Sequence, residues 1–137
     1  MIASKTKTKQ ATIVVVDDDA GIRESLKDLL GLEDWNCAMA ETGEEGLALI
    51  QTLKPALVVT DVQLPDMSGY QLCQSLKRDP SYHGTPVVMM TGRFTEPDDK
   101  NQGFECGADE FFAKPFDPVL FVAKIKSILR GLAPQVA

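Results

Sequence analysis

The stretch Leu57-Val58-Val59-Thr60-Asp61-Val62-Gln63-Leu64-Pro65 begins as a short apolar run, reaches an acidic residue and continues into a loop. A continuous apolar run of this length is typical of a strand that is covered on both faces. The carboxylate of Asp61 would then lie at the carboxyl edge of a sheet, where open α/β folds bind their ligands. Asp61 could equally end the strand or cap a turn, since aspartate is common in both roles. The rest of the chain decides between these two interpretations.

Length and composition limit the classes of protein to consider. A chain of 137 residues predicts one domain, with a core large enough to fold without disulfides. The hydrophobic fraction of 44% and the charged fraction of 25% are typical of a soluble globular protein. The net charge of -6 argues against direct binding of nucleic acid, which favours a basic face. No apolar run suits a membrane span or a signal peptide, so we expect a cytoplasmic protein without a membrane partner.

The cysteines are odd in number and widely spaced, at Cys37, Cys73 and Cys106. This pattern predicts buried apolar residues, not metal ligands or disulfides.

Strand-like and helix-like segments alternate along the chain. Apolar or β-branched runs predict strands over 12–16, 36–40, 57–60, 86–90 and 110–113. Helical periodicity or capping residues predict helices from the N-cap Asp19 to Gly31, over 44–52, from the cap Ser68, over about 98–106, and from Asp117 onward. Such alternation predicts a parallel sheet with helices on both faces. Right-handed crossovers then bring the carboxyl ends of all the strands to one edge.

The ends of the chain differ from this pattern. Residues 1–10 carry alternating lysines and no apolar periodicity, which predicts a disordered tail. We expect the folded domain to span residues 11–132, with a short C-terminal tail over 133–137. No further domain follows the last predicted helix in this sequence. It could therefore be a stand-alone regulator or part of a longer protein.

Polar residues follow the predicted strands at the shared edge. They are the acids Asp17 to Asp19 after the first strand, then Asp61, Thr91 and Lys114. Carboxylates that lie close together repel one another and raise each other's pKa, and a divalent cation removes this cost. Oxygen ligands with room for water suit Mg²⁺.

Adding Lys114 and Thr91 makes the predicted site suitable for a phosphoryl group. The oxygens of a phosphoryl group need cations and hydrogen-bond donors around them. Asp61 would be the nucleophile, because aspartate can accept a phosphoryl group covalently. An ion pair between Lys114 and one of the acids is compatible with this role.

These segments resemble the motifs of the receiver (CheY-like) domain of two-component response regulators. The resemblance rests on Val-Val-Val-Asp17-Asp18-Asp19, Asp61-Val-Gln-Leu-Pro65-Asp-Met-Ser-Gly69, Met-Thr91-Gly92 and Ala-Lys114-Pro115-Phe116. It covers residues 11–132 and implies a single flavodoxin-like (βα)5 domain whose parallel strands are ordered 2-1-3-4-5. It also implies a cis peptide bond between Lys114 and Pro115.

The resemblance assigns a role to each residue of the site. Asp61 would accept the phosphoryl group of a sensor histidine kinase or phosphotransfer protein. Asp18 would bind Mg²⁺ directly and Asp17 through water, while Asp61 and the backbone carbonyl of Gln63 would complete the protein ligands. Thr91 and Lys114 would hold the phosphoryl oxygens after transfer.

The family's switch also has counterparts here. Thr91 would move toward the phosphoryl group and Phe111 would swing inward, reshaping the surface of the fourth helix, fifth strand and fifth helix for a downstream output protein or domain. Many relatives have tyrosine at the place of Phe111, so an output that needs the tyrosine hydroxyl is in doubt. A static Phe111 is the alternative.

The resemblance implies a signalling domain that catalyses its own phosphorylation and dephosphorylation, not an enzyme acting on a separate substrate. We hypothesise that Gln63 and Arg93 tune the hydrolysis. The sequence leaves open which kinase is the partner and whether phosphorylation causes the chain to form a dimer.

Three alternatives compete with the receiver interpretation. A flavin- or nucleotide-binding protein of the same fold would have a Gly/Ser/Thr-rich loop in place of Asp17 to Asp19. A haloacid-dehalogenase-like phosphatase would have a second acid where this chain has Gln63. A pseudo-receiver would bind partners without phosphorylation, and the complete set of acids, threonine and lysine argues against it.

Overall fold

The computed structural model describes residues 11–92 and 106–132. Its strands are β2 (Thr12–Val16), β3 (Asn36–Ala40), β4 (Leu57–Asp61), β5 (Val87–Thr91) and β6 (Glu110–Ala113). Its helices are α1 (Ala20–Gly31), α2 (Gly43–Leu53), α3 (Gly69–Arg78) and α5 (Pro118–Leu132). The predicted tails and nearly all of the predicted helix over 98–106 lie outside the described residues.

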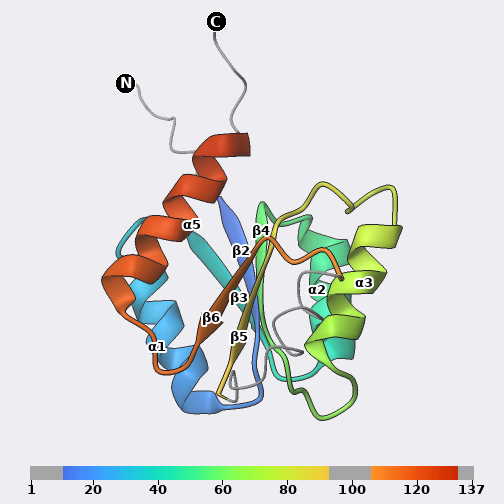
Figure 1. The fold of residues 1–137 in the computed structure, drawn as a ribbon, viewed down its shortest axis with the longest axis horizontal. Coiled ribbons are helices and arrows are strands. Elements are labelled where there is room, and N and C mark those ends of the chain that lie inside the picture. The colour runs from blue at the N-terminus through green and yellow to red at the C-terminus, as the bar shows by residue number, and fades with distance from the viewer. Residues whose placement is uncertain (1–10, 93–105, 133–137) are drawn as a thin grey trace, which may run out of the picture.

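The strands form one parallel sheet in the order β3-β2-β4-β5-β6, which is the predicted order 2-1-3-4-5. In Figure 1 the strands run to the lower edge of the view, so their carboxyl ends lie together there. The register sets Asp61 of β4 beside Met90 of β5, and Thr91 of β5 beside Ala113 of β6. The α/β prediction is confirmed.

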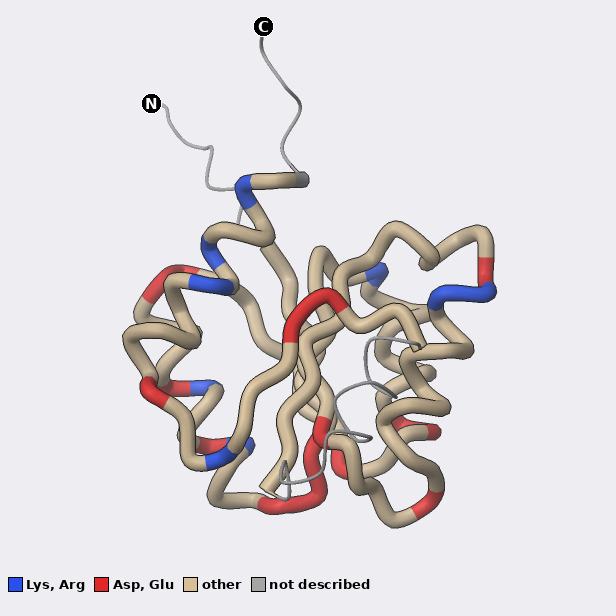
Figure 2. Tube along the Cα trace, in the orientation of Figure 1, with Lys and Arg blue, Asp and Glu red and all other residues tan. Residues whose placement is uncertain are grey.

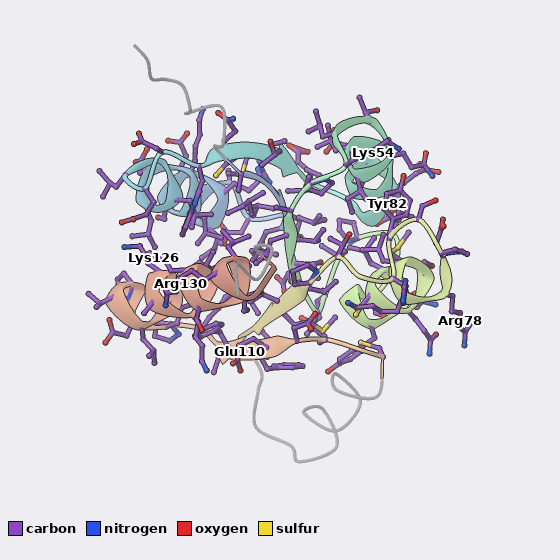
Figure 3. The ribbon with its side chains drawn as sticks, turned by 90° about the horizontal axis from the view of Figure 1, so that it is seen from above. Lys54, Arg78, Tyr82, Glu110, Lys126 and Arg130 are labelled. Carbon is purple, nitrogen blue, oxygen red and sulfur yellow. The ribbon has the colours of Figure 1, made fainter. Side chains whose placement is uncertain are left out.

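Helices cover both faces of the sheet. Seen from above in Figure 3, α1 and α5 lie on one side of the strands and α2 and α3 on the other. Successive strand residues alternate between the two faces. Val14 and Val16 of β2 therefore pack in the cluster on the α2–α3 side, and Ile13 and Val15 pack in the cluster on the α1–α5 side. This is why the central strands read as unbroken apolar runs.

The predicted caps begin the helices. The carboxylate of Asp19 accepts hydrogen bonds from the backbone N–H groups of Gly21 and Ile22 at the start of α1. Ser68 and Gln71 form a reciprocal capping box at the start of α3. At the start of α5, Asp117 accepts from the N–H of Val119. Local sequence therefore determines where these helices begin.

Some details of the prediction were wrong. Helix α2 extends one residue beyond the predicted range 44–52 at each end, and its last residue, Leu53, is 41% exposed. Strands β4 and β5 each extend one residue beyond the predicted range, to Asp61 and Thr91, because the ladder between them continues through the hydrogen bond from the N–H of Val62 to the carbonyl of Met90.

On the α2–α3 side of the sheet in Figure 3, the ammonium of Lys54 at the end of α2 lies 6.0 Å from the ring centroid of Tyr82 in the loop after α3. Within residues 11–92 and 106–132, no helix has both the length and the apolar character that a membrane crossing requires.

Candidate functional site

The carboxyl edge of the sheet brings together the residues predicted from four strand ends. Asp61 and Thr91 are the last residues of β4 and β5, while Asp17 and Lys114 directly follow β2 and β6. Figure 2 shows acidic positions gathered at this lower edge. The position of each residue follows from the parallel register, because neighbouring strands end at nearly the same level.

Lys114 connects two of the carboxylates. Its Nζ lies 2.9 Å from Oδ2 of Asp17 and 3.1 Å from Oδ2 of Asp61. The backbone N–H of Lys114 also donates to the carbonyl of Thr91, and the Lys114–Pro115 peptide bond is cis, as the resemblance implies. One ammonium group therefore neutralises part of the charge of two acids on different strands.

The other oxygens of these acids accept backbone hydrogen bonds. Oδ1 of Asp17 accepts from the N–H of Asp19 at 2.9 Å, and Oδ1 of Asp61 accepts from the N–H of Gln63 at 3.2 Å. Both carboxylates are thus held in one orientation by their own loops.

Burial shifts the pKa values of Asp17 and Lys114 in opposite directions. Asp17 is fully buried, and burial raises the pKa of its carboxyl above the ordinary value, although the hydrogen bond from Lys114 lowers it in part. Burial lowers the pKa of Lys114, but the hydrogen bonds and charges of Asp17 and Asp61 more than offset this, so its pKa is raised. Lys114 is therefore charged at neutral pH.

The acids can hold a divalent cation. Among the described residues, Asp17, Asp18 and Asp61 each offer an oxygen, and these atoms lie within 4.8 Å of one another. Asp18 is exposed, while Asp17 and Asp61 are buried. The exposed carboxylate of Asp18 leaves one side open to water, and an all-oxygen set of this kind fits Mg²⁺.

The predicted switch residues are buried. Thr91 is 5% exposed and Phe111 is 8% exposed, and Phe111 packs in the α2–α3 cluster. The structure records one position of each, so their movement stays a prediction. Gln63 is exposed beside Asp61, whereas Arg93 lies outside the described residues.

The sequence analysis gave no role to three residues that support the site. Arg23 of α1 donates to the backbone carbonyl of Asp17 at 2.7 Å and pairs with Glu41 at 3.3 Å. Asp66 accepts from the N–H groups of Gly43 and Glu44 at 2.8 and 2.9 Å, joining the loop after β4 to the start of α2. The aspartate five residues after Asp61 was a visible signal, but its partners are distant in sequence.

Gly69 is the third of these residues. Its N–H donates to the carbonyl of Val62, and a methyl group at this position would overlap the backbone carbonyl of Asp61. A glycine is needed here because the start of α3 approaches the end of β4 so closely.

A sequence profile described as "Response regulator receiver domain" matches residues 13–126. The chain belongs to this family. The family decides against the flavin-protein and phosphatase alternatives and confirms that this is a receiver domain of two-component signalling.

Named relatives agree with this membership. The receiver domain is 41% identical over 123 residues to the phosphate regulon transcriptional regulatory protein PhoB of Pseudomonas aeruginosa. The aligned region covers 90% of this chain and 53% of PhoB. The signal receiver domain of a signal transduction histidine kinase from Syntrophus aciditrophicus matches with a TM-score of 0.85 and 31% identity, over 93% of this chain and 96% of that one. The chemotaxis response regulator CheY4 of Vibrio cholerae matches with a TM-score of 0.80 and 28% identity, over 87% and 98% of the two chains. The receiver domain spans about half the length of curated relatives such as PhoB.

Proposed function

We propose that Asp61 accepts a phosphoryl group from a phosphohistidine of a sensor kinase or phosphotransfer protein, in a reaction that depends on Mg²⁺. The observation that carries this proposal is the position of the Lys114 ammonium, 3.1 Å from Oδ2 of Asp61 and 2.9 Å from Oδ2 of Asp17. A lysine held against an acid at an acidic strand edge supplies the positive charge that a phosphoryl group needs.

In the transfer, an oxygen of Asp61 attacks phosphorus while the bond from phosphorus to the donor breaks, and the electron pair leaves with the donor. The ammonium of Lys114 can exchange its ion pair with the Asp61 carboxylate for an ion pair with the phosphoryl oxygens. The hydroxyl of Thr91, on the next strand, is the proposed hydrogen-bond donor to the product. Burial of Asp61, which is 9% exposed, limits the access of water to the acyl phosphate.

Asp18, Asp61 and the backbone carbonyl of Gln63 are the proposed direct ligands of Mg²⁺, and Asp17 would act through a bound water. When bound, the ion neutralises the repulsion between carboxylates and phosphoryl oxygens. Self-catalysed phosphorylation and dephosphorylation, with Gln63 acting on the latter, belong to the same proposal.

The proposed output follows from added charge. Aspartyl phosphate places new acceptor oxygens beside Thr91 and Lys114. We propose that Thr91 and Phe111 then shift and alter the surface near β6 and α5, where a downstream protein or domain binds. Residues 11–132 are the proposed domain. The cytoplasmic location stays a prediction.

The donor protein needs a surface next to Asp61. A groove of about 540 Å³ lies between α1 and the loop after β6, and its lining includes Lys114, Leu29, Leu32 and Phe116. Because Lys114 belongs to both the groove and the site, we propose that the phosphohistidine donor contacts this groove.

Acetyl phosphate with Mg²⁺ tests the chemistry directly. The intact mass should increase by one phosphoryl group, and EDTA or the Asp61→Asn variant should abolish the increase. Asp28→Asn, which changes an exposed acid of α1, should keep it. An unlabelled wild-type chain would indicate a pseudo-receiver, and equal labelling of Asp61→Asn would place the phosphoryl group elsewhere.

A further inference from the structure

We propose that Cys73 and Cys106 form a reactive dithiol, which a peroxide converts into an intramolecular disulfide. The site lies between α3 and the start of β6, and it is independent of the phosphoryl chemistry at the opposite edge of the sheet.

The two thiols meet in the core although 33 positions separate them in the sequence. The thiol of Cys73 donates a hydrogen bond to the backbone carbonyl oxygen of Cys106, with 3.4 Å between Sγ and the oxygen. Both residues belong to the cluster between the sheet and the α2–α3 layer. They are free thiols in this structure, and Cys37 packs against the cluster on the other face of the sheet.

The surroundings of the two thiols shift their pKa values in opposite directions. The hydrogen bond from Cys73 lowers the pKa of Cys106 to about 7, against the effect of burial. The same interaction, together with burial, raises the pKa of Cys73 strongly. Cys106 is therefore the more acidic of the two thiols. A thiolate at neutral pH is the form that reacts with oxidants. Cys106 is also the more accessible of the two, at 5% exposed against 0%.

The reaction balances with hydrogen peroxide as the oxidant. The thiolate of Cys106 attacks one peroxide oxygen, the O–O bond breaks, and hydroxide leaves, so Cys106 becomes a sulfenic acid. The interaction with the Cys106 thiolate, which is the largest cause of the raised pKa of Cys73, is then gone. The sulfur of Cys73 loses its proton and attacks the sulfur of Cys106, and water leaves. Two thiols and one peroxide give one disulfide and two waters.

The test uses the full chain, reduced and freed of reductant. It is treated with hydrogen peroxide at neutral pH without denaturant. The remaining thiols are alkylated after denaturation, and the chain is digested and mapped by mass spectrometry without reduction. We expect a peptide pair joined through Cys73 and Cys106, lost after treatment with dithiothreitol.

Cysteine variants and a denatured sample provide the controls. Cys37→Ser should form the same cross-link, whereas Cys73→Ser and Cys106→Ser should not. The denatured wild-type chain should lose the preference for this pair. The proposal is wrong if both thiols remain alkylatable after peroxide, if Cys37 is the main partner, or if the denatured chain forms the link equally. The wild-type map decides the matter even if a core variant fails to fold.

Discussion

The ammonium group of Lys114 lies 2.9 Å from the carboxylate of Asp17, although 97 positions separate the two residues in the sequence. The same ammonium lies 3.1 Å from Asp61 on a third strand end. Lys114 thus holds the acidic edge together by compensating charges that would otherwise repel one another. A bound Mg²⁺ would add positive charge at the same edge.

We expect Lys114→Gln to lower the free energy of unfolding by about 3–5 kcal/mol in EDTA, because it leaves two largely buried carboxylates without their cation. Adding Mg²⁺ should restore more stability to this variant than to the wild type. Thermal unfolding with and without Mg²⁺ measures both effects. Lys124→Gln is the matched control, since Lys124 pairs with Glu110 at 3.1 Å but is 48% exposed. Its loss should be about 0–1 kcal/mol. Equal responses of the two variants would contradict the role of Lys114.

Gly69→Ala should displace the end of β4, because the added methyl group overlaps the backbone carbonyl of Asp61. We expect a loss of about 1–3 kcal/mol in stability from this overpacking, together with slower phosphorylation by acetyl phosphate. Gly31→Ala at the end of α1 meets no atom within 4 Å. That variant should be neutral or about 0.5–1 kcal/mol more stable. Normal phosphorylation of Gly69→Ala would show that the strand end tolerates the shift.

Arg23 is predicted to position the first acidic loop, through its hydrogen bond to the backbone carbonyl of Asp17 and its ion pair with Glu41. Arg23→Ala should weaken Mg²⁺ binding by about 10-fold, as for other residues that orient metal ligands. Isothermal titration with Mg²⁺ measures the change. Arg23→Lys should recover part of the affinity, and unchanged affinity in Arg23→Ala would argue for a purely structural role.

Asp66 should make stability depend on pH in the acid range. The hydrogen bonds from the N–H groups of Glu44 and Gly43 lower the pKa of its carboxyl. A lowered pKa means that the folded state favours the ionised form. Its contribution is therefore present above the ordinary pKa and is lost as the pH falls through the lowered value.

Asp66→Asn should accordingly melt at a lower temperature than the wild type at neutral pH, and the difference should shrink toward zero in acid. Melting curves across this range test the sign, with Asp28→Asn as an exposed control. A difference that grows in acid would be the opposite of this expectation.

A substitution at Leu32 should distinguish a protein phosphoryl donor from a small-molecule donor. Leu32 is 80% exposed and lines the groove that Lys114 also lines. Leu32→Glu should slow transfer from a phosphohistidine protein, which needs the surface, and leave transfer from acetyl phosphate unchanged. Leu53→Glu, at the 41% exposed end of α2, is the control for an added charge. Equal rates of transfer from the protein donor to both variants would show that the donor does not contact this groove.

The sequence by itself determined the strands, the helix starts and the edge at which chemistry gathers. Apolar runs such as Leu57 to Val59 are typical of strands buried on both faces. Asp19 and Ser68 cap helices through hydrogen bonds to residues two or three positions away. These are local effects, so they can be read from neighbouring residues. Parallel alternation then places Asp61, Thr91 and Lys114 at one edge.

Only the tertiary structure decided which groups touch. That Lys114 bridges Asp17 and Asp61, that Arg23 holds a backbone carbonyl, and that Cys73 meets Cys106 depend on distances of a few ångström between segments far apart in the chain. Such distances follow from how the two helical layers pack on a twisted sheet, and no spacing of residues along the sequence encodes them directly.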